Sequence, residues 1–81
     1  MTYPDKIILI KGYTDSNGSQ TYNKKLSEFR ANIVRSFLLG SGIKVKQIQV
    51  KGLGSVNPIE DNNTSWGRMM NRRVEIEIVK E

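Results

Sequence analysis

The chain has 81 residues, enough for one small domain, and we expect residues 1–81 to form a single domain. It contains no cysteine and no histidine, which excludes disulfides, thiol chemistry, the common zinc sites and histidine-based acid–base catalysis from within the chain. The net charge of +5 favours anionic partners. No stretch resembles a signal peptide or a membrane span, which leaves either a cytoplasmic protein or a piece of a longer precursor.

The first predicted strand covers Lys6–Lys11, after a short lead-in at residues 1–5. Its four consecutive apolar residues indicate burial on both faces, as in a central strand. Gly12 ends the strand, and the turn residues of Asp15–Ser19 form a loop.

A long amphipathic helix is predicted from about Asn23, as its N-cap, to about Leu39. At ~100° per residue, one arc of this helix carries four apolar side chains and also contains Arg30. An arginine that faces a sheet must keep its head group in water or find an anion, because burying an unpaired charge is costly. The four apolar residues are Leu26, Ile33, Val34 and Phe37.

Asp15, in the loop at the end of the strand, is the natural counterpart of Arg30. Our hypothesis is that the two residues lie on opposite sides of one pocket and grip a ligand that carries both an amine and a carboxylate. Two simpler interpretations stay open from spacing alone: Arg30 reaches from the helix edge to water, and Asp15 only forms a turn.

The second half of the chain contains two further strands and a short helix. The strand Lys46–Lys51 alternates strictly, with Ile48 and Val50 inward, and strand–helix–strand within this length implies a parallel pair with a right-handed crossover. Thr64–Asn71 is predicted as a short helix capped by Asn63 or Thr64. Its apolar side, which we expect in the core, consists of Trp66, Met69 and Met70.

The last predicted strand is Arg73–Lys80, in which Val74, Ile76 and Ile78 alternate with charged residues. Opposite charges along the outward row are typical of a solvent face or a guarded sheet edge. Together the elements predict an α+β fold in the order β-α-β-(short α)-β, with a small mixed sheet and one main helix on one face.

Four separated motifs support a specific family. The chain resembles the OmpA-like peptidoglycan-binding domain, which occurs in outer membrane protein A, in peptidoglycan-associated lipoprotein and in flagellar stator proteins, and the match covers nearly the whole chain from Ile7 onward. The motifs are Gly-Tyr-Thr-Asp-Ser-Asn-Gly-Ser (12–19), Tyr-Asn-Lys-Lys-Leu-Ser-Glu-Phe-Arg-Ala (22–31), Gly-Leu-Gly (52–54) with Pro58, and Gly-Arg-Met-Met-Asn-Arg-Arg-Val-Glu-Ile (67–76).

The resemblance implies non-covalent binding of peptidoglycan through the diaminopimelate of the stem peptide, which anchors an envelope component to the cell wall from the periplasm. It assigns ligand binding to Asp15 and Arg30, and the matching segments add Thr14, Asn23 and Leu26 to the pocket. It implies neither a metal nor a cofactor. Asn71, Arg72 and Arg73 match a stretch that we interpret first as supporting structure.

The family domain normally begins with a further strand and helix before the segment that matches Ile7, so the chain resembles a shortened version. Without that strand, strand 73–80 is expected to be an open edge. We therefore expect a homo-oligomer formed through an exposed sheet edge, with segment exchange as another route to association and a shortened domain that repacks on its own as the alternative.

Two other function classes remain as alternatives. One is a small basic nucleic-acid-binding module, although the strands lack paired aromatics for base stacking and the basic residues do not cluster on one element. The other is a truncated structural piece that oligomerises without binding a ligand. An enzyme is not expected, because the chain has no catalytic constellation.

Overall fold

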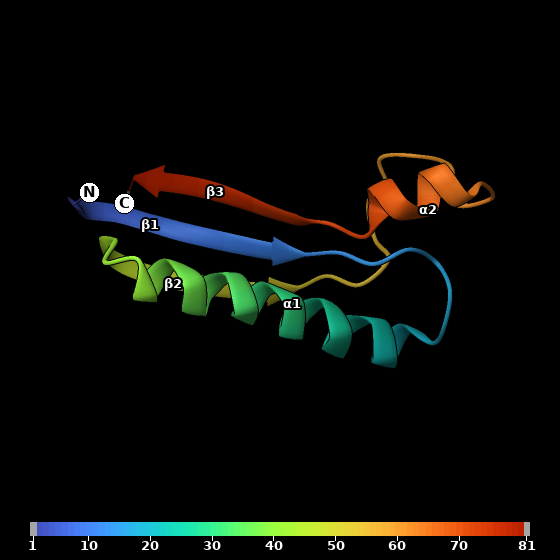
Figure 1. Cartoon of the computed structure of the whole chain (residues 1–81), viewed down its shortest axis with the longest axis horizontal. Coiled ribbons are helices and arrows are strands. Elements are labelled where there is room, and N and C mark those ends of the chain that lie inside the picture. Colours follow the sequence, from blue (N-terminus) through green and yellow to red (C-terminus); the bar gives the residue numbers. More distant parts are fainter. Residues whose placement is uncertain (1, 81) are drawn as a thin grey trace.

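Five elements follow one another in the computed structural model, which describes residues 2–80 (Figure 1). The strand β1 spans Thr2–Gly12, so it begins earlier than the predicted Lys6, and β2 spans Lys44–Gly52. The remaining elements are α1 (Gln20–Gly40), α2 (Ser65–Asn71) and β3 (Val74–Lys80). The predicted α+β fold and the order of its elements are confirmed. No helix within residues 2–80 is long and apolar enough to cross a membrane.

The three strands form one mixed sheet in the order β2-β1-β3. β1 runs parallel to β2 and antiparallel to β3, which confirms β1 as the central strand. Ile10 pairs with Val50 on one side and with Ile76 on the other. Directly paired residues lie on the same face of a sheet, so these three side chains share the face that α1 covers.

The core lies between that face and α1 (Figure 1). Ile8, Ile10 and Ala31 are its fully enclosed members, with partly buried aliphatic residues around them. The predicted orientation of the helix is only partly right. Ile33 and Phe37 are 55% and 71% exposed, and the buried positions of α1 are Asn23, Ser27 and Ala31.

Two glycines explain this rotation of the helix. Gly12 and Gly52 are paired across β1 and β2, beneath the first half of α1. A Cβ at Gly12 would collide with the carbonyl of Ser27, and one at Gly52 would lie 2.5 Å from the carbonyl oxygen of Lys24. The backbone of the helix therefore approaches the strands too closely for large side chains, and small polar residues take the inward positions.

The helix α2 also differs from the prediction. Its cap is Thr64, whose hydroxyl accepts a hydrogen bond from the amide of Gly67, as expected. Trp66, Met69 and Met70 are not core residues, because they are 61%, 49% and 37% exposed.

The residue of α2 whose side chain is fully buried is Asn71, and it holds the helix against the preceding loop. Its Oδ1 accepts hydrogen bonds from the amides of Ile59 and Glu60, and its Nδ2 donates to the carbonyl of Glu60 and to Asn62 Oδ1.

The helix-facing side of β3 is largely uncovered. Ile76 and Ile78 are 52% and 57% exposed, because α1 packs mainly on β1 and β2. A packed helix occupies a width of about 8–10 Å, and neighbouring strands lie about 4.8 Å apart. One helix therefore covers two strands, and the third strand remains open. On the opposite face, Lys11 pairs with Glu77 at 3.2 Å and Arg73 pairs with Glu75 at 2.7 Å.

Candidate functional site

The loop between β1 and α1 is held on both sides as it leaves the sheet. The amide of Tyr13 donates to the carbonyl of Arg73, and the amide of Thr14 donates to that of Gly54, both at 2.8 Å. Tyr13, Thr14 and Asp15 are buried, although two of them are polar. The loop therefore presents Asp15 from a rigid position.

The side chain of Asp15 accepts two hydrogen bonds, and a cation donates one of them. Its Oδ1 accepts from the amide of Asn17 at 2.9 Å, and its Oδ2 accepts from Nη1 of Arg72 at 2.7 Å. Burial alone would raise the pKa of this carboxyl. The hydrogen bonds from Arg72 and Asn17 and the charges of Arg72 and Arg68 outweigh it and lower the pKa, so Asp15 is ionised at neutral pH.

Asn23 braces the loop from within the helix. The predicted N-cap at Asn23 is wrong: α1 begins at Gln20, and the hydroxyl of Ser19 caps it by accepting from the amide of Tyr22 at 3.1 Å. Asn23 is buried one turn later, and its Nδ2 donates to the carbonyl of Asn17. It therefore fixes the residue whose amide binds Asp15.

A neighbouring helical residue ties the same end of α1 to the β2 side. Ser27 Oγ accepts from the amide of Gly54 at 3.0 Å, and it donates to the carbonyl of Lys24. Since Gly54 also accepts from the amide of Thr14, the helix, the β1–α1 loop and the segment after β2 are joined at one point.

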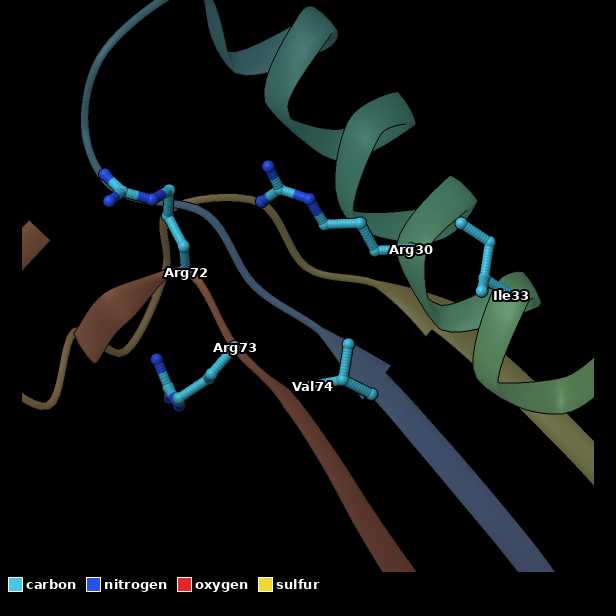
Figure 2. A pocket seen from close by; sticks show the side chains of 5 residues that line it. All are labelled: Arg30, Ile33, Arg72, Arg73 and Val74. Carbon is cyan, nitrogen blue, oxygen red and sulfur yellow. The ribbon is translucent and has the colours of Figure 1, made fainter. Parts of the chain in front are cut away.

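Arg30 lies beside an open cavity of about 420 Å³. The cavity is lined by Arg30 and Ile33 of α1 and by Arg72, Arg73 and Val74. Figure 2 shows the guanidinium groups of Arg30 and Arg72 lying toward the β1–α1 loop, whereas Arg73 extends to the other side. Within residues 2–80, Nη1 of Arg30 is buried and has no hydrogen-bond partner. Such a donor needs an acceptor, which solvent or a bound molecule in the cavity can supply.

The predicted site residues fall into two groups. Thr14, Asp15 and Asn23 belong to the hydrogen-bonded loop, with Thr14 Oγ1 donating to the carbonyl of Asp15 at 2.9 Å. Arg30 lines the cavity, and Leu26 lies half-buried one turn before it on α1.

Sequence reasoning missed Arg72, the residue that bonds directly to Asp15. The only signal for it was the Arg72–Arg73 pair after Asn71. The second arginine of this pair is otherwise engaged, with its guanidinium 3.9 Å from the centre of the Tyr13 ring and hydrogen-bonded to Glu75.

The cavity is lined by the guanidinium-bearing Arg30 and Arg72, and Asp15, which is not itself among the lining residues, is tied to it through its ion pair with Arg72. This arrangement can hold a molecule with both charges through ionic hydrogen bonds, for which the planar arginine fork is well suited. Within residues 2–80, no cluster of three or more carboxylate, histidine or cysteine side chains could hold a metal ion.

Comparisons with known sequences agree on one family. The model of the OmpA family matches residues 1–72. Outer membrane protein A of Bordetella avium is 51% identical over 72 residues, which cover 89% of this chain and 37% of that protein. The peptidoglycan-binding protein ArfA of Mycobacterium tuberculosis is 51% identical over 73 residues, covering 90% of this chain and 22% of that protein. The chain thus spans about a third or less of these relatives.

Solved structures share the fold. The C-terminal domain of Helicobacter pylori MotB superposes with a TM-score of 0.85 at 31% identity, covering 98% of this chain and 62% of that one. The peptidoglycan-associated lipoprotein of Burkholderia pseudomallei gives 0.83 at 32% identity, covering 90% and 62%. With a family model that matches most of its length and with these sequence and structural relatives, the chain belongs to the OmpA family.

Proposed function

We propose that this chain binds peptidoglycan non-covalently through the diaminopimelate of the stem peptide, and that it anchors an envelope component to the cell wall from the periplasm. The observation that carries the proposal is the buried Nη1 of Arg30, which no group within residues 2–80 satisfies, at a cavity that is also lined by Arg72, the partner of the buried carboxylate of Asp15. The relative ArfA is named as a peptidoglycan-binding protein, which supports the same class of ligand.

The free end of diaminopimelate carries an ammonium and a carboxylate on one carbon atom. In our proposal its carboxylate accepts from Arg30, which Figure 2 shows at the cavity, and its ammonium donates to Asp15. Thr14 and Asn23 keep the loop rigid through their hydrogen bonds. The apolar lining of the cavity comes from Ile33 and Val74, and Leu26 is not among its lining residues. A rigid site loses little conformational entropy on binding, which favours affinity.

Nothing in this arrangement performs chemistry on the ligand. Neither the cavity nor the loop offers an activated nucleophile or a metal centre among the described residues. Binding without cleavage is therefore the function that we propose.

The experiment is an NMR titration of the ¹⁵N-labelled chain with a stem peptide that ends in diaminopimelate. Shifts centred on Thr14, Asp15 and Arg30 support the proposal, and shifts confined to other regions, or none, would contradict it. The matched control variants are Arg35→Ala, an exposed arginine of the same helix, and Asp61→Ala, whose Oδ1 accepts from the amide two residues on as Asp15 does. Both controls should bind like the unaltered chain, whereas Arg30→Ala and Asp15→Ala should not.

We further propose that the chain self-associates through the edge of β3. In the described sheet β3 has β1 on one side only, and its Ile76 and Ile78 are more than half exposed. An uncovered edge with apolar side chains is a template for pairing with a second copy. Light scattering after size exclusion should give a molar mass above that of the monomer at micromolar concentration, and a clean monomer would contradict this proposal.

A further inference from the structure

The carboxylate that should receive the ligand's ammonium is already occupied by a cation of the chain itself. Oδ2 of Asp15 accepts from Arg72 at 2.7 Å and Oδ1 from the amide of Asn17, and only 10% of the Asp15 side chain is exposed. Each carboxylate oxygen can accept a further hydrogen bond, but with so little of the side chain exposed the carboxylate offers almost no free surface. An incoming ammonium gains access to Asp15 where one of the present donors, Arg72, withdraws.

We propose that the Asp15–Arg72 ion pair is the closed form of the binding site and that the ligand opens it by exchange. This inference rests on the proposed function. The ligand's ammonium takes the place of Arg72 on Asp15, and the released Arg72 guanidinium turns to the ligand's carboxylate beside Arg30. No covalent bond is made or broken.

The two partners differ in how easily they can move. Asp15 lies in the rigid loop, held through Asn17 and, behind it, Asn23. Arg72 follows α2 as its C-cap residue, and 41% of its side chain is exposed. The long arginine side chain lines the cavity together with Arg30, so its guanidinium can leave Asp15 without leaving the site (Figure 2). Arg72 is thus the component that moves.

The balance of charges makes the exchange selective. A zwitterionic end supplies an ammonium for Asp15 and a carboxylate for the two arginines, so every charge keeps a partner. A ligand with an amine but no carboxylate would release Arg72 as a second cation without an anion, beside Arg30, whose Nη1 has no partner in the described chain even before the exchange. Like charges brought together without an anion are unfavourable, so such a ligand cannot open the site effectively.

Arg72 is therefore a specificity-determining residue. It makes the site discriminate a stem peptide that ends in an α-amino-acid group, as diaminopimelate does, from one that carries a plain side-chain amine, as lysine does. Without Arg72, Asp15 would accept either ammonium.

The test is calorimetry with two stem tripeptides, one ending in diaminopimelate and one in lysine, on the unaltered chain and on Arg72→Gln. For the unaltered chain we expect the diaminopimelate peptide to bind at least about tenfold tighter, the equivalent of one charge-assisted hydrogen bond. In Arg72→Gln the diaminopimelate peptide should bind more weakly and the lysine peptide more tightly. The ratio of the two affinities should therefore fall by about tenfold.

A purely structural role for Arg72 predicts another result: Arg72→Gln would weaken both peptides equally, and an unchanged affinity ratio would overturn the proposal. Arg72→Lys keeps the charge that closes the site, so it should restore most of the ratio, while the control Arg35→Gln should leave it unaltered. The NMR spectrum of each variant verifies that it is folded.

Failure of the exchange and failure of the proposed function give distinct results. If the unaltered chain binds neither peptide, the proposed function falls and the exchange falls with it. If the diaminopimelate peptide binds and shifts Arg30 but the Arg72 Nε–H resonance does not move, only the exchange is overturned.

Discussion

The two ends of the molecule differ in whether they bury polar side chains. At the end where α2 and the loops gather (Figure 1), the buried residues are mostly polar, and hydrogen bonds engage them. They are Thr14, Asp15, Asn23, Ser27 and Asn71. Both ends expose large apolar side chains, Trp66 and Ile59 at the first and Phe37, Leu39 and Ile78 where α1 and β3 finish, but only the first end has a buried polar network beneath them.

Each end is therefore specified by different physics. Buried polar groups with defined partners fix a single geometry, which a ligand site requires. Exposed apolar side chains fix no geometry by themselves and gain stability only when another surface covers them. The comparison predicts that substitutions at the first end act on folding and ligand affinity, whereas substitutions at the second act on association.

The largest expected effect is the loss of Asn71. Asn71→Ala leaves the amides of Ile59 and Glu60 without their acceptor and opens a buried space, so we expect the free energy of unfolding to fall by about 3 kcal/mol. Urea denaturation followed by circular dichroism measures it. Asn63→Ala is the control, because Asn63 is an exposed asparagine of the loop that Asn71 holds, and it should change stability little. Equal stability of the two variants would contradict the role that we assign to Asn71.

The next effect separates binding from stability at one residue. Arg30→Met removes the buried donor that has no partner in the described chain, so the unliganded protein should be as stable as before or more stable by about 1 kcal/mol. Binding of the diaminopimelate peptide should weaken by at least about tenfold.

Arg35→Met is the matched control for Arg30→Met, since it removes an exposed arginine from the same helix. It should leave the affinity unchanged. If Arg30→Met destabilised the free protein strongly while Arg35→Met did not, Arg30 would be a structural residue rather than a ligand-binding one.

The pH dependence of stability sharpens the comparison further. The pKa of Asp15 is lowered in the folded chain, so this residue stabilises the fold above its ordinary pKa of 3.8 and the contribution is lost as the pH falls through the folded value. Urea midpoints measured between pH 7 and pH 2 should fall less steeply on acidification for Asp15→Asn than for the unaltered chain. Asp61→Asn should retain the steep dependence. If both variants lost the steep dependence equally, the assignment of the acid sensitivity to Asp15 would be contradicted.

The sequence predicted the elements and their order because local patterns encode them: four apolar residues for a central strand, strict alternation for β2, and a helical period for α1. It did not predict the rotation of α1. That rotation depends on Gly12 and Gly52, which meet the helix only after the strands have paired.

The candidate site follows the same rule: its locally distinctive residues could be predicted from the sequence, and its long-range contacts could not. Asp15 and Arg30 stand out within their own segments, as an acid in a turn and a cation on an apolar arc. Arg72 reaches Asp15 across 57 positions of sequence, and no local period or spacing announces such a contact. The family resemblance pointed to Asn71 as supporting structure, and its four hydrogen bonds agree, but no local pattern predicted its full burial or its partners in the loop before α2.

The smallest expected effect on the free chain lies in β3. Ile76 and Ile78 are already more than half exposed, so Ile76→Glu should change the free energy of unfolding by less than about 1 kcal/mol. A charge on an uncovered strand opposes both edge pairing and burial of the face, so the variant should be monomeric by light scattering where the unaltered chain associates. Leu39→Glu is the matched control, since Leu39 is 53% exposed and belongs to α1 rather than to the β3 edge. If only Ile76→Glu gives a monomer, the association surface is confined to β3. If both substitutions give monomers, the surface includes the end of α1 as well, and association through the β3 edge alone is contradicted.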